Sequence, residues 1–287
     1  MAVLLDQSSS IPFPQIVGNA DEQSTSNKLW LRPFGFRAED LAIDFDHTAR
    51  PWLEIQILAC CTTDKAGHNP EEGFFWKLDL SQRTECLLAI TSLAHSSRQI
   101  NVDLRCQNSK CHEEMEVEFS MQDIANIQNS SEQNESIAVE INHQLFSLRK
   151  PKGSDQLKWL SDSYRGESSA AQYMINSLLP EEQQLTFHPQ GEQNSDWLQN
   201  INDAMQAMDP LVNFRINTSC PSCEKQYAYD IDFGEICLQK LQSAQNRLIE
   251  TVHTLAFYYH WNDQDIFALP PWRLQRHLSL IEQESKR

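Results

Sequence analysis

The sequence predicts an α+β protein made of two related halves, each with a β-hairpin that carries two cysteines at its tip and is flanked by helices. Two segments predict this class, because residues 100–121 and 214–231 both combine alternating apolar residues with closely spaced cysteines. A long amphipathic helical pattern at 237–259 follows the second segment. With 287 residues, 40% of them hydrophobic, the chain is long enough for one large domain or two ordinary ones.

The composition argues against several classes of function. The 23 basic and 40 acidic residues give a net charge of −17, whereas a nucleic-acid binder usually presents a basic face. No apolar run approaches the roughly 20 residues of a membrane helix, and the N-terminal stretch lacks the basic segment of a signal peptide. The eight cysteines then indicate a reducing compartment. We therefore expect a cytoplasmic protein with no nucleic-acid or membrane partner.

Composition along the chain suggests an arm followed by two halves. Residues 1–28 are polar, contain Pro12 and Pro14, and are expected to form a flexible arm. The N-terminal half covers 29–127 and the C-terminal half covers 137–287, with the polar loop 128–136 between them.

The first half has one predicted strand and one predicted helix besides its hairpin. Residues 50–60 (RPWLEIQILAC) are expected to form a strand, and the polar residues 64–73 a turn. Apolar residues at helical spacing predict a helix over 80–94, with Ser81 as its cap.

The second half is richer in helix. Residues 137–148 predict a hairpin whose turn lies near Asn142–His143. The remaining segments before the second cysteine pair are predicted to be two short helices at 154–164 and 168–179, a polar loop at 181–194, and a helix at 195–208.

The pattern at 237–259 predicts a helix of about seven turns that packs along one side, although a helix that fills a partner's groove has the same pattern. A short helix capped by Asn262 follows, and Pro271 can open the last helix.

The two cysteine segments match in phase on both arms. Apolar residues or Thr occupy alternate positions before the first cysteine of each pair and again after the second. Each segment therefore predicts a hairpin with a zinc-ribbon-like knuckle at its tip. The spacings, Cys106 to Cys111 and Cys220 to Cys223, are within the range of structural zinc sites.

Zinc prefers four ligands, so two knuckles face to face would complete one closed, structural site on Cys106, Cys111, Cys220 and Cys223. Two alternatives remain: the turns hold no metal, or His112 replaces Cys111 as a ligand. The other thiols, of Cys60, Cys61, Cys86 and Cys237, lie in apolar runs and are expected to be buried in the core.

Signals of catalysis are weak. Glu250, His253 and His260 lie on the long helix, but their spacing is not that of a helical metalloprotease, and no nucleophile motif accompanies them. No glycine-rich phosphate loop is present among the eight glycines. We therefore predict no catalytic residues and no organic cofactor.

The C-terminal third contains a series of distinctive motifs: Asp209-Pro210, Cys220 to Cys223, Glu250 with Val252 and His253, Tyr259 with Trp261, Ile266 to Leu269, and Arg273 with Arg276. Together with the first cysteine pair and the segments 80–90 and 146–160, they cover roughly residues 75–284. This series resembles the T4-type bacteriophage baseplate protein family as found in phage-like contractile injection system gene clusters. The chain departs from the family in a longer first knuckle and in Glu224, which stands where a glycine, often with positive φ, is usual.

The resemblance implies a non-enzymatic baseplate component or baseplate assembly factor of a phage-tail-like contractile particle, with other baseplate or tail subunits as partners. The rival predictions are a hydrolase-like enzyme that carries a structural zinc, and a nucleic-acid-binding zinc-ribbon protein.

Overall fold

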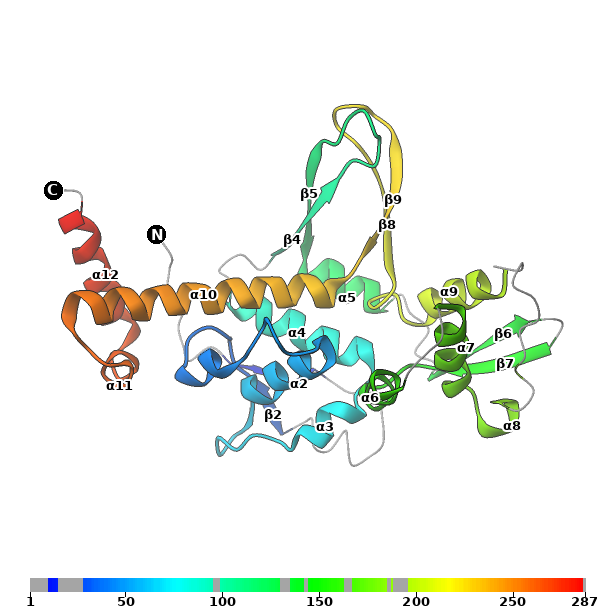
Figure 1. Ribbon diagram of the computed structural model, residues 1–287, viewed down its shortest axis with the longest axis horizontal. Helices are drawn as coiled ribbons and strands as arrows, with labels where there is room; N and C mark the ends of the chain where they lie inside the picture. Colours follow the sequence, from blue (N-terminus) through cyan, green and yellow to red (C-terminus); the bar gives the residue numbers. More distant parts are fainter. Residues whose placement is uncertain are drawn as a thin grey trace. The chain divides into compact units, whose positions relative to one another are not determined.

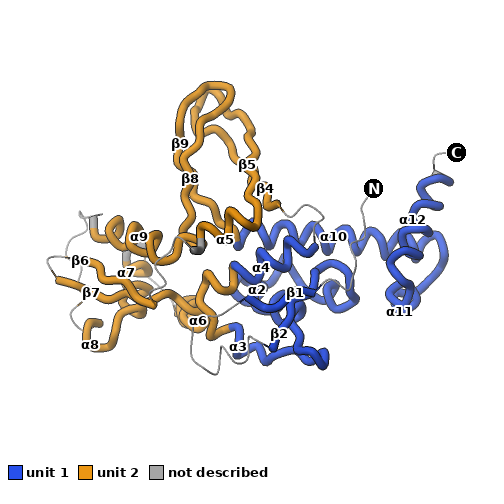
Figure 2. Tube along the Cα trace, turned by 180° about the vertical axis from the view of Figure 1, so that it is seen from behind, with its two compact units in different colours: residues 1–75, 85–98, 234–287 blue, residues 76–84, 99–233 orange. Residues whose placement is uncertain are grey.

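Helices and small antiparallel sheets make up the chain, so the α+β class is confirmed (Figure 1). The computed structural model describes residues 10–14, 28–94, 99–129, 135–141, 144–162, 167–184, 187 and 196–285. Contacts divide the chain into two compact units (Figure 2). Unit 1 holds residues 1–75, 85–98 and 234–287, and unit 2 holds residues 76–84 and 99–233. The division into sequential halves at 29–127 and 137–287 stays a prediction.

A three-stranded antiparallel sheet opens unit 1. Strand β2 (Leu29–Leu31) lies between β1 (Ile11–Pro12) and β3 (Thr62–Asp64). Phe13 is buried and donates its backbone N–H to the Leu29 carbonyl at 3.0 Å. Residues 10–14 of the expected arm are therefore tied to this sheet, whereas residues 1–9 and 15–27 lie outside the described residues.

The segment predicted as a strand at 50–60 is instead helix α2 (Arg50–Cys61), and that prediction was wrong. Leu53, Ile55 and Ile57 alternate with polar residues in the sequence, which suggested period two. Glu54, however, is buried beside them and pairs with Arg50 Nε at 2.9 Å, one helical turn away. Because this charged residue belongs to the buried face, the helical stripe was hidden.

The other helices of unit 1 agree better with expectation. Helix α4 (Leu80–Ala94) is confirmed, although its first residues belong to unit 2. Its cap is Asp79, whose Oδ1 accepts the Gln82 backbone N–H at 2.8 Å, and not Ser81, which donates its hydroxyl to the same oxygen. The remaining short helices at the start of the chain are η1 (Ala38–Ala42) and α3 (Glu72–Lys77).

Helix α10 (Phe233–Tyr259) confirms the long amphipathic helix, with Leu241, Val252 and Leu255 among its buried residues. Helices α11 (Asp263–Phe267) and α12 (Pro271–Ser285) follow it and enclose a small apolar cluster with the end of α10. The side chain of Asn262 caps α11 by accepting the Asp265 N–H at 2.9 Å, as predicted. None of the helices in the described part of the chain is long and apolar enough to cross a membrane.

Unit 2 contains three hairpins and five helices within the described residues. The strands are β4 (Gln99–Arg105), β5 (Glu114–Ser120), β6 (Ser136–Ile141), β7 (Gln144–Arg149), β8 (Phe214–Ser219) and β9 (Gln226–Ile231). The helices are α5 (Met121–Asn129), α6 (Gly153–Ser161), α7 (Glu167–Ser177), α8 (Glu181–Gln184) and α9 (Asp196–Met208). The sequence predicted all three hairpins and α6, α7 and α9, but not α5 or α8.

The hairpin β6–β7 has its own apolar core. Val139, Ile141, Phe146 and Leu148 are buried from the two strands, and Ile201 joins them from α9. The turn expected at residues 142–143 lies outside the described residues. This hairpin is therefore held by the packing of its own apolar core.

Candidate metal centre

The two cysteine-bearing hairpins pair their strands in the same way. In β4–β5 the apolar partners are Ile100 with Phe119, Val102 with Val117, and Leu104 with Met115. In β8–β9 they are Phe214 with Ile231, Ile216 with Tyr229, and Thr218 with Tyr227. These are the residues whose matching phase was recognised in the sequence. All of them are buried or half-buried, while the residues between them are mostly exposed.

The hairpins lie side by side in both views of unit 2 (Figures 1 and 2). At their bases, three aromatic rings meet: Phe119 of β5 lies edge-on to Phe214 and Phe233, with centroids 5.6 and 5.4 Å away, and these two rings stack on each other. Near the tips, Gln107 Nε2 donates to the Ala228 carbonyl of the other hairpin at 3.1 Å. The pair of hairpins is thus joined at both ends.

Each tip is a turn whose backbone points N–H groups at sulfur. The N–H groups of Asn108, Glu113 and Lys225 donate to the thiols of the cysteines two residues before them. The turns are closed by backbone hydrogen bonds from Cys106 N to Glu113 O at 2.8 Å and from Cys220 N to Lys225 O at 3.0 Å. Donors of this kind stabilise thiolates and orient them as metal ligands.

The four thiols converge on one point between the tips. Cys106 Sγ lies 3.6 Å from Cys223 Sγ, and Cys111 Sγ lies 3.7 Å from Cys220 Sγ, each pair spanning the two hairpins. All four sulfur atoms lie within 4.8 Å of one another. Four zinc–sulfur bonds of about 2.3 Å in tetrahedral geometry would place the sulfurs about 3.8 Å apart. The observed separations fit that arrangement.

The protonation of the thiols is uneven. Desolvation raises the pKa of Cys106 to about 12. The Asn108 side chain and then the Lys225 backbone donate hydrogen bonds that lower the pKa of Cys223 to about 6. Because a metal binds the thiolate form, occupation of the site requires proton loss from Cys106.

His112 does not join the thiol cluster: its side chain is exposed, and the Cys111 sulfur is the atom that lies within 4.8 Å of the other three thiols. Cys61, Cys86 and Cys237 are buried, as predicted. Cys60 is only partly buried, so the prediction of a core thiol was wrong there. It lies beside Asp40, Cys61 and Arg32. Sequence reasoning missed this cluster because it is assembled by the loop 33–37 and the start of η1, which holds Asp40.

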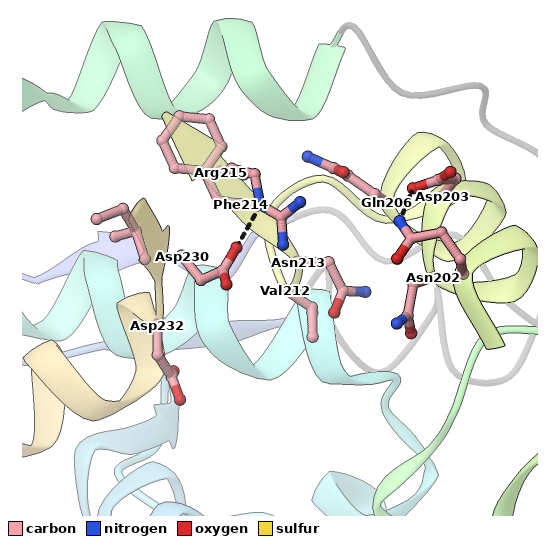
Figure 3. Close-up of a pocket in the computed structure, with 11 residues that line it drawn as sticks. Asn202, Asp203, Gln206, Val212, Asn213, Phe214, Arg215, Asp230 and Asp232 are labelled. Carbon is pink, nitrogen blue, oxygen red and sulfur yellow. Dashed lines mark hydrogen bonds and ion pairs between the residues drawn. The ribbon is translucent and has the colours of Figure 1, made fainter. Parts of the chain in front are cut away.

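Unit 2 also has a shallow pocket of about 300 Å³ between α9 and the base of β8–β9. Arg215 Nε donates to Asp230 Oδ1 across the strands at 2.6 Å. Figure 3 shows this pair beside Asn202 and Gln206 of α9. Amides, carboxylates and this guanidinium make its polar lining, and none of the described residues that line it is a cysteine, serine, threonine or histidine. The pocket therefore lacks the usual nucleophiles.

Two of the weak catalytic candidates, Glu250 and His253, lie on α10 in unit 1, whereas His260, which was expected on the same helix, lies just beyond its last residue, Tyr259. Glu250 and His253 are both exposed, and the His253 ring stacks on Phe257 with centroids 6.4 Å apart. The aromatic residues near the end of the chain divide into two groups: Tyr259 and Trp261 stack on each other at 4.7 Å, whereas Trp272 is 70% exposed.

The T4 bacteriophage base plate protein family matches residues 31–236, which include both cysteine hairpins. The match begins upstream of residue 75, where the resemblance in the sequence starts, and it ends before most of α10, so the resemblance at 237–284 stays a prediction. No curated protein and no solved structure matches the chain. Since the match covers well over half of the residues, the chain belongs to the T4 bacteriophage base plate protein family.

Proposed function

We propose that the protein is a non-enzymatic baseplate component, or baseplate assembly factor, of a phage-tail-like contractile injection particle, and that one structural zinc ion fastens its paired hairpins. Family membership supports the baseplate role. The observation that supports a zinc ion is the convergence of four thiols from two hairpins, at separations that fit tetrahedral coordination. These thiols belong to Cys106, Cys111, Cys220 and Cys223.

A bound zinc ion would supply a rigid cross-link and no reactive position. Four thiolates complete the tetrahedral shell, so no site is left for the water molecule that catalytic zinc activates. An isolated two-stranded hairpin is at best marginally stable in water. The tips of β4–β5 and β8–β9 therefore gain most from such a cross-link, because the aromatic contacts of Phe119, Phe214 and Phe233 are at the opposite end.

The partners are expected to be other baseplate or tail subunits. The outward positions of β5, Glu114, Glu116 and Glu118, are exposed and acidic, and the whole chain carries a net charge of −17. A rigid acidic surface steers encounter with basic partner surfaces and disfavours acidic ones. The zinc would contribute by fixing the hairpins that present this surface.

Metal analysis of the purified full-length protein tests the zinc. We expect one zinc ion per chain, lost in Cys111→Ser and Cys220→Ser but retained in Cys86→Ala, a buried cysteine outside the cluster. Chelation is expected to lower the Tm of the wild type by at least about 5 °C, corresponding to roughly 2 kcal/mol in a domain of this size. A purified protein that contains no zinc, and whose Tm does not change when a chelator is added, would contradict the proposed zinc site.

Association with tail proteins tests the baseplate role separately. The protein is expected to co-purify with sheath, tube or baseplate subunits encoded beside it when these are expressed together. Wild type and Cys220→Ser should be compared, so that a failure of the zinc site is distinguished from a failure of the baseplate assignment. Absence of the wild-type protein from both assembling and finished particles would contradict the role.

A further inference from the structure

Four side chains of unit 1 form a second cluster that the proposed function does not use. Arg32 is buried and binds the buried Asp40 in a two-pronged ion pair, with Nη2 to Oδ1 at 2.7 Å and Nη1 to Oδ2 at 3.2 Å. The same Nη2 donates to Cys60 Sγ at 3.1 Å, at the end of α2. Cys61, the next residue, is fully buried. A cationic donor thus faces a thiol that solvent can partly reach.

The carboxylate of Asp40 is already satisfied. Its Oδ2 accepts backbone N–H groups from three successive residues, Gly35, Phe36 and Arg37, at 2.8, 2.9 and 3.0 Å. These three donors and the guanidinium together over-compensate one negative charge. The environment of Cys60 Sγ therefore favours a thiolate, even though the thiol form can also donate to Asp40 Oδ1, which is 3.4 Å away.

A metal ion fits this cluster poorly. Asp40, Cys60 and Cys61 offer three ligand atoms within 4.8 Å of one another. The guanidinium of Arg32 lies 3.1 Å from Cys60 Sγ and would repel a metal ion bound to that sulfur. The Asp40 carboxylate already accepts three backbone N–H groups, so it has little capacity left for a metal. In addition, desolvation keeps the pKa of Cys61 well above that of an ordinary thiol. The chemistry that remains is that of an activated nucleophile.

We propose that Cys60 is an oxidation site, at which small hydroperoxides convert the thiol to a sulfenic acid. The thiolate sulfur attacks one peroxide oxygen, an S–O bond forms, and the O–O bond breaks. The sulfur is oxidised by two electrons and the hydroperoxide is reduced to an alcohol, or to water when hydrogen peroxide is the oxidant. The thiol proton ends on the leaving oxygen. Arg32 is the positioning residue, since its Nη2 holds the thiolate and can also donate to the departing oxygen.

Two further observations support this assignment. Of the four cysteines outside the metal centre, all of them in the described part of the chain, Cys60 is the one that is not buried. Its pKa is lowered, first by the hydrogen bond from the Cys61 thiol and also by the charge of Arg32. Low pKa, a neighbouring Arg and partial exposure together are typical of oxidant-sensitive cysteines.

Trapping of sulfenic acid in the reduced, full-length protein tests the site. Hydrogen peroxide is added with dimedone, and the adduct at each cysteine is measured by mass spectrometry. We expect at least ten-fold more adduct at Cys60 than at Cys86 or Cys237. The adduct should persist at a lower level in Cys61→Ala, which loses the hydrogen bond from the Cys61 thiol, and should be absent in Cys60→Ser. Equal labelling of Cys60 and Cys86, or an adduct found on Cys61 in place of Cys60, would overturn the proposal.

The role of Arg32 has its own test. Arg32→Met should slow adduct formation at Cys60 at least ten-fold. Because loss of this buried residue can unfold unit 1, the wild type is also alkylated with iodoacetamide over a range of pH. The rate at Cys60 is expected to reach half its maximum below the ordinary thiol pKa of about 8.5. A midpoint at or above that value would overturn the proposal whatever the variant does.

Discussion

His112 and Glu224 occupy equivalent positions in the two knuckles. Each residue directly follows the second cysteine of its pair, and each has a positive φ, 54° for His112 and 58° for Glu224. This conformation is strained for residues other than glycine. The sequence expectation that Glu224 occupies a glycine-like position is therefore met, and the first knuckle repeats the geometry despite its longer turn.

Glycine at either position should stabilise the protein. We expect His112→Gly and Glu224→Gly to raise the free energy of unfolding by about 0.5–1 kcal/mol each, since relief of the left-handed conformation outweighs the added freedom of the unfolded chain. Thermal melts of the zinc-loaded variants provide the measurement. Glu224→Ala is the matched control, because alanine keeps the Cβ atom that causes the strain. An alanine variant as stable as the glycine variant would contradict this explanation.

Removal of the metal should loosen two hairpins and spare the third. Hydrogen exchange of the backbone amides of β4, β5, β8 and β9 is expected to accelerate by about ten-fold or more in the chelated protein, because opening of these strands then costs less free energy.

The hairpin β6–β7 is the internal control, since its core of Val139, Phe146 and Leu148 does not involve the cysteines. Equal acceleration in all three hairpins would mean that the metal stabilises unit 2 as a whole.

The aromatic contacts at the hairpin bases should stabilise the protein independently of zinc binding by the thiols at the tips. Phe119 is 8% exposed, and Phe119→Ala is expected to cost about 3–4 kcal/mol in the free energy of unfolding, because it removes the ring that contacts both Phe214 and Phe233. Urea denaturation measures the loss, and metal analysis should still find one zinc ion per folded chain. A folded Phe119→Ala protein without zinc would show that the bases position the thiols.

Asp209 provides a prediction on pH. This buried carboxylate has its pKa raised to about 6, first by desolvation and also by the charge of Asp79. Its Oδ2 has no hydrogen-bond partner among the described residues. Since the folded pKa lies above the unfolded value of about 3.9, the folded state holds the proton more tightly, and stability is lost as the pH rises from about 4 through 6.

Asp209→Asn should therefore stabilise the protein relative to the wild type at about pH 8, by on the order of 2–3 kcal/mol, and have little effect at about pH 4. The measurement is urea denaturation of both proteins at each pH, which cancels contributions from other titrating groups. Asp203→Asn removes an exposed carboxylate of α9 and serves as the control. A stability difference that does not change with pH would contradict the pKa shift.

The hairpins and the thiol cluster were predictable because their information is local and repeated. Alternation around each cysteine pair indicated a hairpin with the cysteines at its tip, and the ligand preference of zinc indicated that the two pairs should meet across more than 100 residues. The helices α4, α9 and α10 were predictable because their apolar stripes are long.

Other features could not be read in this way. Glu54 is a buried charge whose partner, Arg50, is one helical turn away, so hydropathy alone placed α2 in the wrong class. The environment of Cys60 depends on backbone N–H groups of Gly35, Phe36 and Arg37, and every residue has such a group. Sequence patterns report which side chains are apolar, but they do not report where a loop directs its amides.

The interleaving of the two units along the chain has a consequence for synthesis. Unit 1 includes residues 234–287, so it cannot be completed on the ribosome until these residues have emerged, long after residues 1–75. In the same way, more than 100 further residues must be translated after Cys111 before Cys220 and Cys223 are available to complete the thiol cluster. A stop codon late in the gene would therefore leave the first-made segments of unit 1 without their packing partners, rather than merely trim a dispensable tail.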